Sequence, residues 1–351
     1  MSEVLQKLGL VPFFAQQVAD TSLSKNRLGR VTAVQRSQST VLCDSGEHAV
    51  ELSPGLLQRS VVDRPTVGDW VVLDASLSRI DQVLERKSLF KRVAAGKSTE
   101  IQPIAANIDT LFIVTSCNDE FKESRLERYL ALCAEAGATP VIVLTKIDLT
   151  DDVDTYVRRA RSVQAGVPVE TVNTLDPVTL NGVRAWIDDN STIALVGSSG
   201  VGKSTLLNAL AGSLLAETRK IREQDKKGRH TTTHRELHQL PSGGLMIDVP
   251  GMRELRVADV EQSIGVVFED IERLATQCQF ADCKHETEPG CAVLQAIEAN
   301  KLDSRRLASY QKLQRESALA TATLAEKRAQ GRQFAKLVKE VKHIKQKKGS
   351  I

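Results

Sequence analysis

The stretch GSSGVGKS at residues 197–204 decides the fold of the central part of this 351-residue chain. The apolar run 193–196 precedes it and the run 205–210 follows it, a pattern that predicts a strand, a glycine-rich loop and a helix. In such a loop, successive backbone N–H groups and a helix N-terminus surround an anionic phosphate. The sequence therefore predicts a P-loop nucleotide site on an α/β sheet.

The residue types in this loop fit the contacts that phosphates and Mg²⁺ require. Gly197 and Gly202 allow the turn and a close approach of the backbone, and Lys203 would reach the β- and γ-phosphates. Ser204 would supply an oxygen to Mg²⁺. The expected phosphate-binding set is Gly197, Ser198, Ser199, Gly200, Val201, Gly202, Lys203, Ser204 and Thr205.

A second motif, Asp248-Val-Pro-Gly251, follows the apolar run 245–247 about 45 residues after the P-loop. Asp248 at a strand end fits a carboxylate that holds a Mg²⁺-bound water, and the N–H of Gly251 fits a γ-phosphate sensor. The hydrophilic stretch 228–234 between the two motifs suits a switch loop. Thr232 in that stretch is the expected second Mg²⁺ ligand besides Ser204.

The segment Thr145-Lys146-Ile147-Asp148 follows a continuous apolar run at 140–144 and is typical of guanine recognition. Asp148 can accept hydrogen bonds from N1–H and N2–H₂ of guanine, which adenine does not offer, and the stem of Lys146 can lie against the ring. Thr145 stands where asparagine is usual and lacks its amide. We therefore predict that Asp148 makes the site specific for GTP, and that the contacts usually supplied by the asparagine amide are altered.

The order of these motifs is unusual, because the guanine-reading segment lies about fifty residues before the P-loop. In an ordinary GTPase it comes after the P-loop. The sequence therefore predicts a circularly permuted GTPase.

Cys278, Cys283, His285 and Cys291 supply three thiolates and one imidazole within fourteen residues. This is the ligand set of a structural zinc site, and four protein ligands leave no open position for catalysis. We expect one structural Zn²⁺ per chain. The remaining cysteines, Cys43, Cys117 and Cys133, lie in apolar contexts and are expected to be buried thiols.

The order of the predicted strands and helices along the chain indicates three structured parts. Short strand candidates with turn signals, such as 29–34, 39–43 and 70–73, favour a small β-barrel, with an OB-fold as a natural candidate. Apolar strands and amphipathic helices then alternate and predict a three-layer α/β domain with a parallel sheet. The expected division is a flexible extension at 1–24, an OB-fold RNA- or ribosome-binding domain at 25–103, the permuted GTPase domain at 104–262 and a zinc-binding helical domain at 263–351.

Composition indicates the cellular compartment in which the protein is expected to act. The net charge is only +3, there is no basic start followed by an apolar core, and no apolar run approaches the roughly 18 residues of a membrane helix. Together with the single metal-type cysteine cluster, this predicts a cytoplasmic protein that does not engage membranes. A monomer is the default expectation, since no coiled-coil seam is evident.

The C-terminal tail carries the strongest local charge. The segment from Lys327 to Lys348 contains nine basic residues and a single acidic residue, Glu340. In a helix, positions 332, 336, 339 and 343 would lie on one face. We expect this helix to bind the phosphate backbone of RNA.

With these motifs in this order, the chain resembles the RsgA (YjeQ/YloQ) family of bacterial ribosome-small-subunit-dependent GTPases. The resemblance covers about residues 27–300. It implies an OB domain, a permuted GTPase domain and a zinc-binding helical domain. It also implies a role in late maturation of the 30S subunit and its 16S rRNA, other assembly factors as partners, and GTP hydrolysis to GDP stimulated by that subunit.

The catalytic set expected on this basis is Lys203, Asp248, Gly251 and His230. Met252 follows Gly251, where many GTPases place the glutamine that orients the attacking water. A methionine cannot do this, so we predict slow intrinsic hydrolysis, with His230 as the substitute group or merely a packing residue of the loop. Two alternatives remain: an RNA-binding assembly factor with an inactive nucleotide site, and an RNA-modifying enzyme with a GTPase module.

Overall fold

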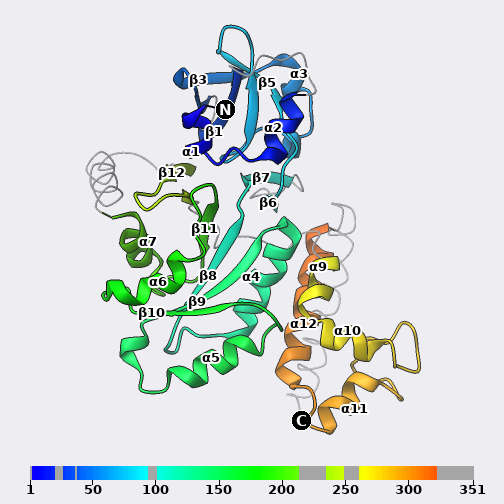
Figure 1. Ribbon diagram of the computed structural model, residues 1–351. Coiled ribbons are helices and arrows are strands. Elements are labelled where there is room, and N and C mark those ends of the chain that lie inside the picture. The colour runs from blue at the N-terminus through cyan, green and yellow to red at the C-terminus, as the bar shows by residue number, and fades with distance from the viewer. Residues whose placement is uncertain are drawn as a thin grey trace, which may run out of the picture.

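The structure is a computed structural model, and it describes residues 2–19, 27–35, 38–93, 101–212, 235–248 and 261–321. Figure 1 shows a barrel that carries the N-terminus at one end, a sheet flanked by helices in the middle, and a group of helices at the other end.

The chain begins with two short helices, α1 (Glu3–Lys7) and α2 (Pro12–Ala19). The hydroxyl of Ser2 caps α1 by accepting a hydrogen bond from the N–H of Val4 at 3.2 Å. Apolar side chains of both helices and the turn between them are buried in the main core, namely Leu5, Leu8, Leu10, Phe14 and Val18. The expectation of a flexible extension is therefore wrong for residues 2–19, because these side chains anchor the segment.

The barrel consists of β1 (Leu28–Val34), β2 (Ser39–Cys43), β3 (Gly46–Leu52), β4 (Trp70–Leu73) and β5 (Arg79–Val83). The strand order is β1-β2-β3-β5-β4, and β4 pairs back with β1 and closes the sheet. Helix α3 (Pro54–Leu57) and a 3-10 turn (Val61–Asp63) join β3 to β4. A closed five-stranded barrel filled by Val31, Val41, Val50, Val71 and Ile80 agrees with the predicted OB-fold.

A two-stranded sheet, β6 (Leu89–Val93) and β7 (Ile101–Ala106), links the barrel to the central sheet. The predicted boundary at 103/104 lies within β7, so this strand is shared between the two parts.

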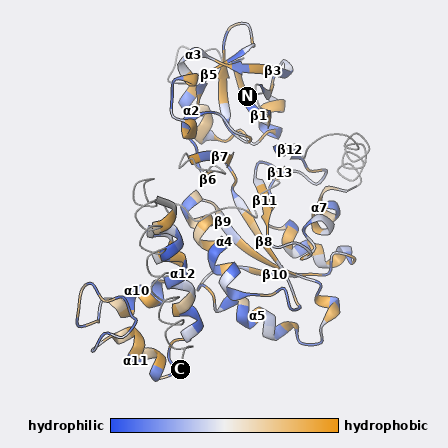
Figure 2. Ribbon diagram, turned by 180° about the vertical axis from the view of Figure 1, so that it is seen from behind, coloured by the Kyte–Doolittle hydropathy of each residue, from blue (hydrophilic) through white to orange (hydrophobic). Residues whose placement is uncertain are grey.

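The central sheet has the order β10-β9-β8-β11-β13-β12. Its parallel strands are β8 (Thr110–Ser116), β9 (Thr139–Thr145), β10 (Val169–Val172), β11 (Thr192–Val196) and β13 (Leu245–Asp248), and β12 (Arg235–Gln239) is antiparallel to β13. Apolar residues dominate the parallel strands β8, β9, β11 and β13 (Figure 2). This agrees with the predicted parallel sheet covered on both faces.

Helices cover both faces of this sheet. They are α4 (Glu123–Ala136), α5 (Val153–Arg161), α6 (Asn181–Arg184) and α7 (Lys203–Ala211), with 3-10 turns at Ile147–Leu149 and Pro177–Leu180. Alternate residues of β8 separate the two faces: Leu111 and Ile113 belong to the same apolar cluster as α4, whereas Phe112 and Val114 join the cluster of α7. This is the three-layer arrangement that the alternating pattern predicts.

The last described part is helical, as predicted, and contains α9 (Glu261–Val267), α10 (Glu269–Ala275), α11 (Ala292–Glu298) and α12 (Ser304–Thr321). Both α9 and α12 contact α4 (Figure 1). The joint is built on the fully buried Glu127 of α4, which accepts hydrogen bonds from Arg305 and Arg306 at 3.1–3.2 Å. Arg306 also binds Asp270 at 2.6 and 2.8 Å, so α4, α10 and α12 are held together.

Barrel and central sheet are hydrogen-bonded to each other through β1. The first half of β1 pairs with β4, and after a bulge Ala33 and Val34 pair with Glu236 and Arg235 of β12. Beside this junction, the buried Arg30 donates to the carbonyl oxygens of Leu8, Gly68 and Asn107 and to Oγ1 of Thr192. One arginine thus joins the N-terminal segment, the barrel, the linking region and the P-loop strand.

Candidate nucleotide site and metal centre

The P-loop lies between the end of β11 and the start of α7, as predicted. Gly197 has a φ of +148°, and a Cβ atom there would lie 2.1 Å from the carbonyl oxygen of Val114 in β8. Gly202, with a φ of +91°, is the N-cap of α7. A side chain at Gly197 would push the loop off the sheet, so this glycine is required by close backbone approach.

Lys203 and Ser204 lie at the N-terminus of α7, and the N-terminus of a helix favours an anion. The ammonium of Lys203 lies over the loop and donates to the carbonyl oxygen of Gly197 at 2.7 Å and to that of Ser198. Ser199, Gly200, Ser204 and Thr205 are exposed. The loop therefore presents the hydroxyl groups of Ser199, Ser204 and Thr205 on an accessible surface, while Lys203 is half-buried.

The guanine-reading segment is next to the P-loop, although it lies far from it in the sequence. Thr145 ends β9 and is fully buried, and its Oγ1 lies 2.6 Å from the carbonyl oxygen of Val201 and 3.1 Å from that of Thr115. A hydroxyl can donate to only one of them at a time. Thr145 thus supplies a side-chain link to the P-loop despite lacking an amide.

The two residues expected to face the base differ in their settings. Lys146 has a left-handed backbone, with φ 57° and ψ 38°, which turns the chain sharply after β9. Asp148 follows in a 3-10 turn and is exposed. A base could therefore reach its carboxylate from solvent.

Asp248 ends β13 at the same edge of the sheet. Strand β13 runs parallel to β11, with Ala194 opposite Ile247, so Asp248 lies beside the end of the P-loop strand. In open α/β sheets, ligands bind at the carboxyl ends of the strands. The other expected switch residues, His230, Thr232 and Gly251, together with Val249 and Met252, lie outside the described residues, as does the basic tail at 327–348.

One contact at this edge was not predicted from the sequence. Arg125 in the first turn of α4 donates to the hydroxyl of Ser198 in the P-loop and lies 3.2 Å from a carboxylate oxygen of Glu120. No local motif marks this residue. Its position after β8, the strand beside β11, was the available signal, and it required knowledge of the strand order.

The four predicted zinc ligands come together at the start of α11. Their ligand atoms all lie within 4.8 Å of one another. Nδ1 of His285 is 3.3–3.6 Å from the three sulfur atoms, and the Sγ atoms of Cys278 and Cys291 are 3.9 Å apart. Ligands at Zn–S of about 2.3 Å and Zn–N of about 2.0 Å in a tetrahedron are about 3.5–3.8 Å apart, so the residues fit Zn²⁺.

Residues of the cluster themselves shape the loop around it. His285 is buried and has a φ of 58°, and Sγ of Cys291 caps α11 by accepting from the N–H of Leu294. The remaining cysteines are buried, as expected. Burial raises the pKa of Cys117 to about 11 and that of Cys133 to about 12, which keeps both thiols protonated and unreactive at neutral pH.

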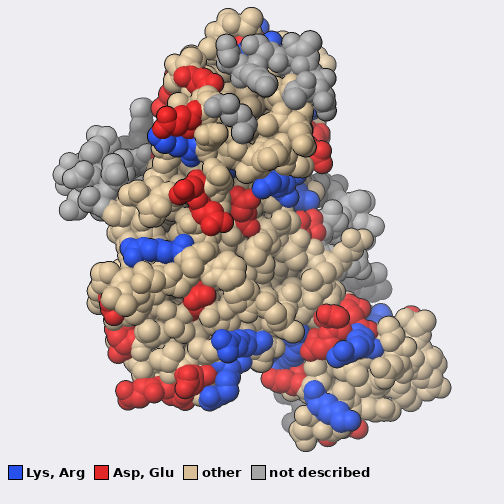
Figure 3. All heavy atoms as spheres, viewed as in Figure 1, with Lys and Arg blue, Asp and Glu red and all other residues tan. Residues whose placement is uncertain are grey.

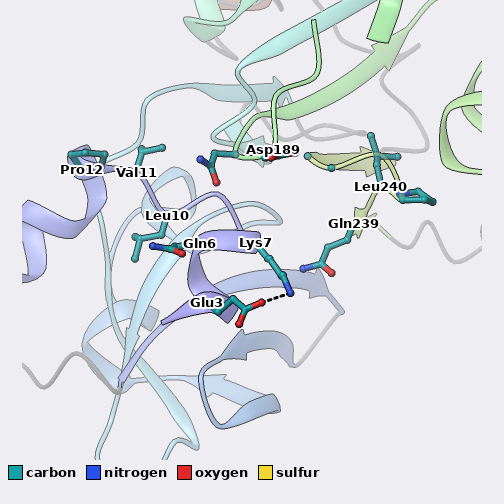
Figure 4. Close-up of a pocket in the computed structure, with 13 residues that line it drawn as sticks. Glu3, Gln6, Lys7, Leu10, Val11, Pro12, Asp189, Gln239 and Leu240 are labelled. Atoms are coloured by element: carbon teal, nitrogen blue, oxygen red, sulfur yellow. Dashed lines mark hydrogen bonds and ion pairs between the residues drawn. The ribbon is translucent and has the colours of Figure 1, made fainter. Parts of the chain in front are cut away.

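A separate cavity of about 760 Å³ lies between the N-terminal segment and the β12–β13 hairpin (Figure 4). Glu3 and Lys7 on its wall pair with each other at 2.7 Å, and Leu10, Val11 and Pro12 line it from the turn between α1 and α2. The two charged residues of α1 on this wall thus neutralise each other, and the cavity is a groove between the N-terminal segment and the central sheet. Among the described residues, no helix is long and apolar enough to cross a membrane.

The fold and the site define a P-loop GTPase with permuted strand order, and comparison with known proteins agrees. The family model described as RsgA GTPase matches residues 83–258, and one described as 50S ribosome-binding GTPase matches residues 192–340. The chain belongs to the RsgA GTPase family. It is a GTP hydrolase, which argues against the alternative of an inactive nucleotide site.

Curated relatives cover nearly the whole chain. The protein named small ribosomal subunit biogenesis GTPase RsgA 2 of Vibrio parahaemolyticus is 47% identical over 347 residues, which are 99% of this chain and 95% of the relative. The small ribosomal subunit biogenesis GTPase RsgA of Mesorhizobium japonicum is 44% identical over 322 residues, 90% of each chain.

Two solved structures share the fold. YjeQ from Thermotoga maritima matches with a TM-score of 0.60 and 25% identity, covering 82% of this chain and 96% of YjeQ. YloQ, described as a circularly permuted GTPase, matches with a TM-score of 0.57 and 26% identity, covering 81% of this chain and 92% of YloQ. The predicted permutation is therefore supported by both the strand order and the solved relatives.

Proposed function

We propose that this GTPase binds the small (30S) ribosomal subunit, acts in its late maturation, and hydrolyses GTP faster when bound to it. The observation that carries the proposal is the 47% identity, over nearly the full length, to a small ribosomal subunit biogenesis GTPase. The P-loop glycines, Lys203 and Thr145 in their observed positions support a working nucleotide site.

The residue roles follow from the chemistry of phosphoryl transfer, which requires positioning and charge stabilisation. Lys203 and the N–H groups of the P-loop hold the phosphates, the N–H of Gly251 contacts the γ-phosphate, and Asp148 selects guanine. Mg²⁺, when bound, neutralises the phosphate charge developed during transfer to water. Ser204 and Thr232 would hold it directly, and Asp248 would hold it through a water molecule.

Bound GTP orders the switch segments and sets a shape that docks on the subunit, and hydrolysis relaxes them and promotes release. The OB barrel at 25–103 and the zinc-binding helical domain at 263–351 flank the GTPase domain at 104–262 and contact the 16S rRNA. The protein acts as a cytoplasmic monomer, with other assembly factors as neighbours on the subunit. Zn²⁺ has a structural role, since Cys278, Cys283, His285 and Cys291 fill a tetrahedron.

His230 takes the place of the usual glutamine in this proposal, because Met252 cannot orient a water molecule. We expect His230→Ala to lower the subunit-stimulated turnover by at least tenfold while GTP affinity changes little. A stimulated rate equal to that of the unmodified protein would leave His230 with only a packing role.

The test of the proposal is GTP turnover by the purified protein, alone and with purified 30S subunits, with ATP and 50S subunits as controls. Stimulation by 30S subunits alone, and with GTP alone, is the expected result. Equal slow turnover in all conditions would remove the small subunit from the mechanism.

A further inference from the structure

A small basic pocket lies between α4 of the GTPase domain and α12 of the helical domain. It has a volume of about 260 Å³ and is lined by Lys122, Ser124, Arg125, Arg128, Ser309, Lys312 and Leu313. Four of these residues are cations, contributed by two helices that are far apart in the sequence. Both helices lie side by side in Figures 1 and 2.

The acids around the pocket neutralise only part of this charge. Arg125 pairs with Glu120 at 3.2 Å, and Arg128 pairs with Glu316. Within the described ranges, no acid pairs with Lys122 or Lys312. On the face shown in Figure 3, basic and acidic side chains are intermixed. The two lysines therefore leave a local excess of positive charge in a concave site.

We propose that this pocket binds a backbone phosphate of the small-subunit RNA. Its volume lies below the roughly 300–1,000 Å³ of sites that enclose a whole small molecule. A phosphodiester group on a larger chain fits it better, and lysine and arginine are the residues that bind such groups. This inference rests on the proposed binding of the small subunit and identifies a contact made by the GTPase part itself.

The pocket is directly connected to the nucleotide site. Arg125 lines it and also donates to the hydroxyl of Ser198 in the P-loop. A phosphate in the pocket competes with Glu120 for the same guanidinium group. Occupation of the pocket therefore changes how Arg125 holds the P-loop, which gives the subunit RNA a short path to the site of hydrolysis.

The binding test compares Lys122→Ala/Lys312→Ala with the unmodified protein, measuring affinity for 30S subunits at several salt concentrations. We expect affinity to fall about three- to tenfold and the slope of log K against log salt to become shallower by about one, as for a lost phosphate contact. Lys122→Arg/Lys312→Arg, which keeps the charge, should bind within about twofold of the unmodified protein.

A control with the same charge change is Arg158→Ala/Arg161→Ala, at two exposed positions of the GTPase domain outside the pocket. Equal losses in both double variants would mean general charge attraction and would overturn the pocket. Unchanged affinity and salt slope in Lys122→Ala/Lys312→Ala would overturn it as well. If the unmodified protein does not bind 30S subunits, the proposed function fails first and the pocket falls with it.

The connection to the P-loop is tested with Arg125→Lys, which keeps a cation in the pocket. The lysine side chain is shorter, so its ammonium stops short of the position of Nη1, the arginine atom that contacts both Glu120 and Ser198. We expect subunit binding within about twofold and subunit stimulation of GTP turnover reduced at least fivefold. Full stimulation in this variant would overturn the connection and leave the pocket as a docking contact only.

Discussion

On each side of the central sheet, a buried arginine helps to join the sheet to the neighbouring part of the fold, and the two arginines have different kinds of partner. Arg30, on the barrel side, donates to three carbonyl oxygens and one hydroxyl. Arg306, on the helical side, binds the carboxylates of Glu127 and Asp270 and two carbonyl oxygens. One joint is built from neutral acceptors and the other from paired charges.

This difference is visible in the acid–base behaviour of the two residues. Burial lowers the pKa of Arg30 to about 10, and the charges of Asp109 and Asp69 oppose this only in part. Burial also acts to lower the pKa of Arg306, but Asp270 and Glu127 outweigh it, so its pKa is raised. The helical joint thus depends on compensation between charges, and the loss of one partner should cost it more.

The largest expected effect concerns the helical side alone. Removal of Zn²⁺ by a chelator should unfold the segment around α11, because the ligands hold the loop 278–291 against it and structural zinc sites contribute about 10 kcal/mol or more in zinc-finger peptides. Limited proteolysis with zinc analysis would show cleavage near this segment while the barrel stays intact. Cys283→Ala should behave like the chelated protein, and Cys43→Ala in the barrel should not. Cleavage in the barrel as well would contradict the expectation that the loss of zinc affects the helical side alone.

The next effect is the loss of Arg306. Arg306→Met leaves the fully buried Glu127 with only Arg305 as a partner and should lower the free energy of unfolding by about 3–5 kcal/mol. Denaturant unfolding followed by circular dichroism measures it. Arg305→Met is the matched control and should cost under about 1 kcal/mol, since Arg305 is partly exposed. Equal costs would mean that the charges around Glu127 are shared evenly.

A smaller loss is expected on the barrel side. Arg30→Met removes the donor of four hydrogen bonds but leaves no unpaired charge, so the expected cost is about 2–3 kcal/mol. The same unfolding measurement applies, with Arg27→Met, a partly exposed residue of the barrel, as the control. A cost larger than that of Arg306→Met would reverse the comparison.

The smallest effect is a dependence on acid. Burial acts to raise the pKa of Asp270, but its hydrogen bonds and ion pair with Arg306 outweigh this and the pKa is lowered. The stabilisation is therefore complete above the usual carboxyl pKa of about 4 and is lost as pH falls through the lower folded value. The difference in Tm between Asp270→Asn and the unmodified protein should be at most a few degrees and should shrink below pH 4. The difference for Arg30→Met should change less, because its acceptors do not titrate.

The sequence predicted what is encoded in neighbouring residues. Gly197 to Ser204 and the four zinc ligands each form a local motif, so their geometry follows from a short stretch of chain. Arg30, Arg125 and Arg306 were missed because the partners through which they join separate parts of the fold are 22–179 residues away and depend on strand order and helix packing. Helix α1 was missed because five residues are too few to show a helical period.

The short pairing between β1 and β12 has a consequence for the solubility of the parts. Strand β12 would otherwise be the outer strand of the central sheet, and an exposed strand offers unpaired N–H and C=O groups to other chains. The barrel strand occupies part of that edge through Ala33 and Val34. A fragment cut at the linking region would expose this edge, so the central sheet is protected against self-association by a neighbour that precedes it in the chain.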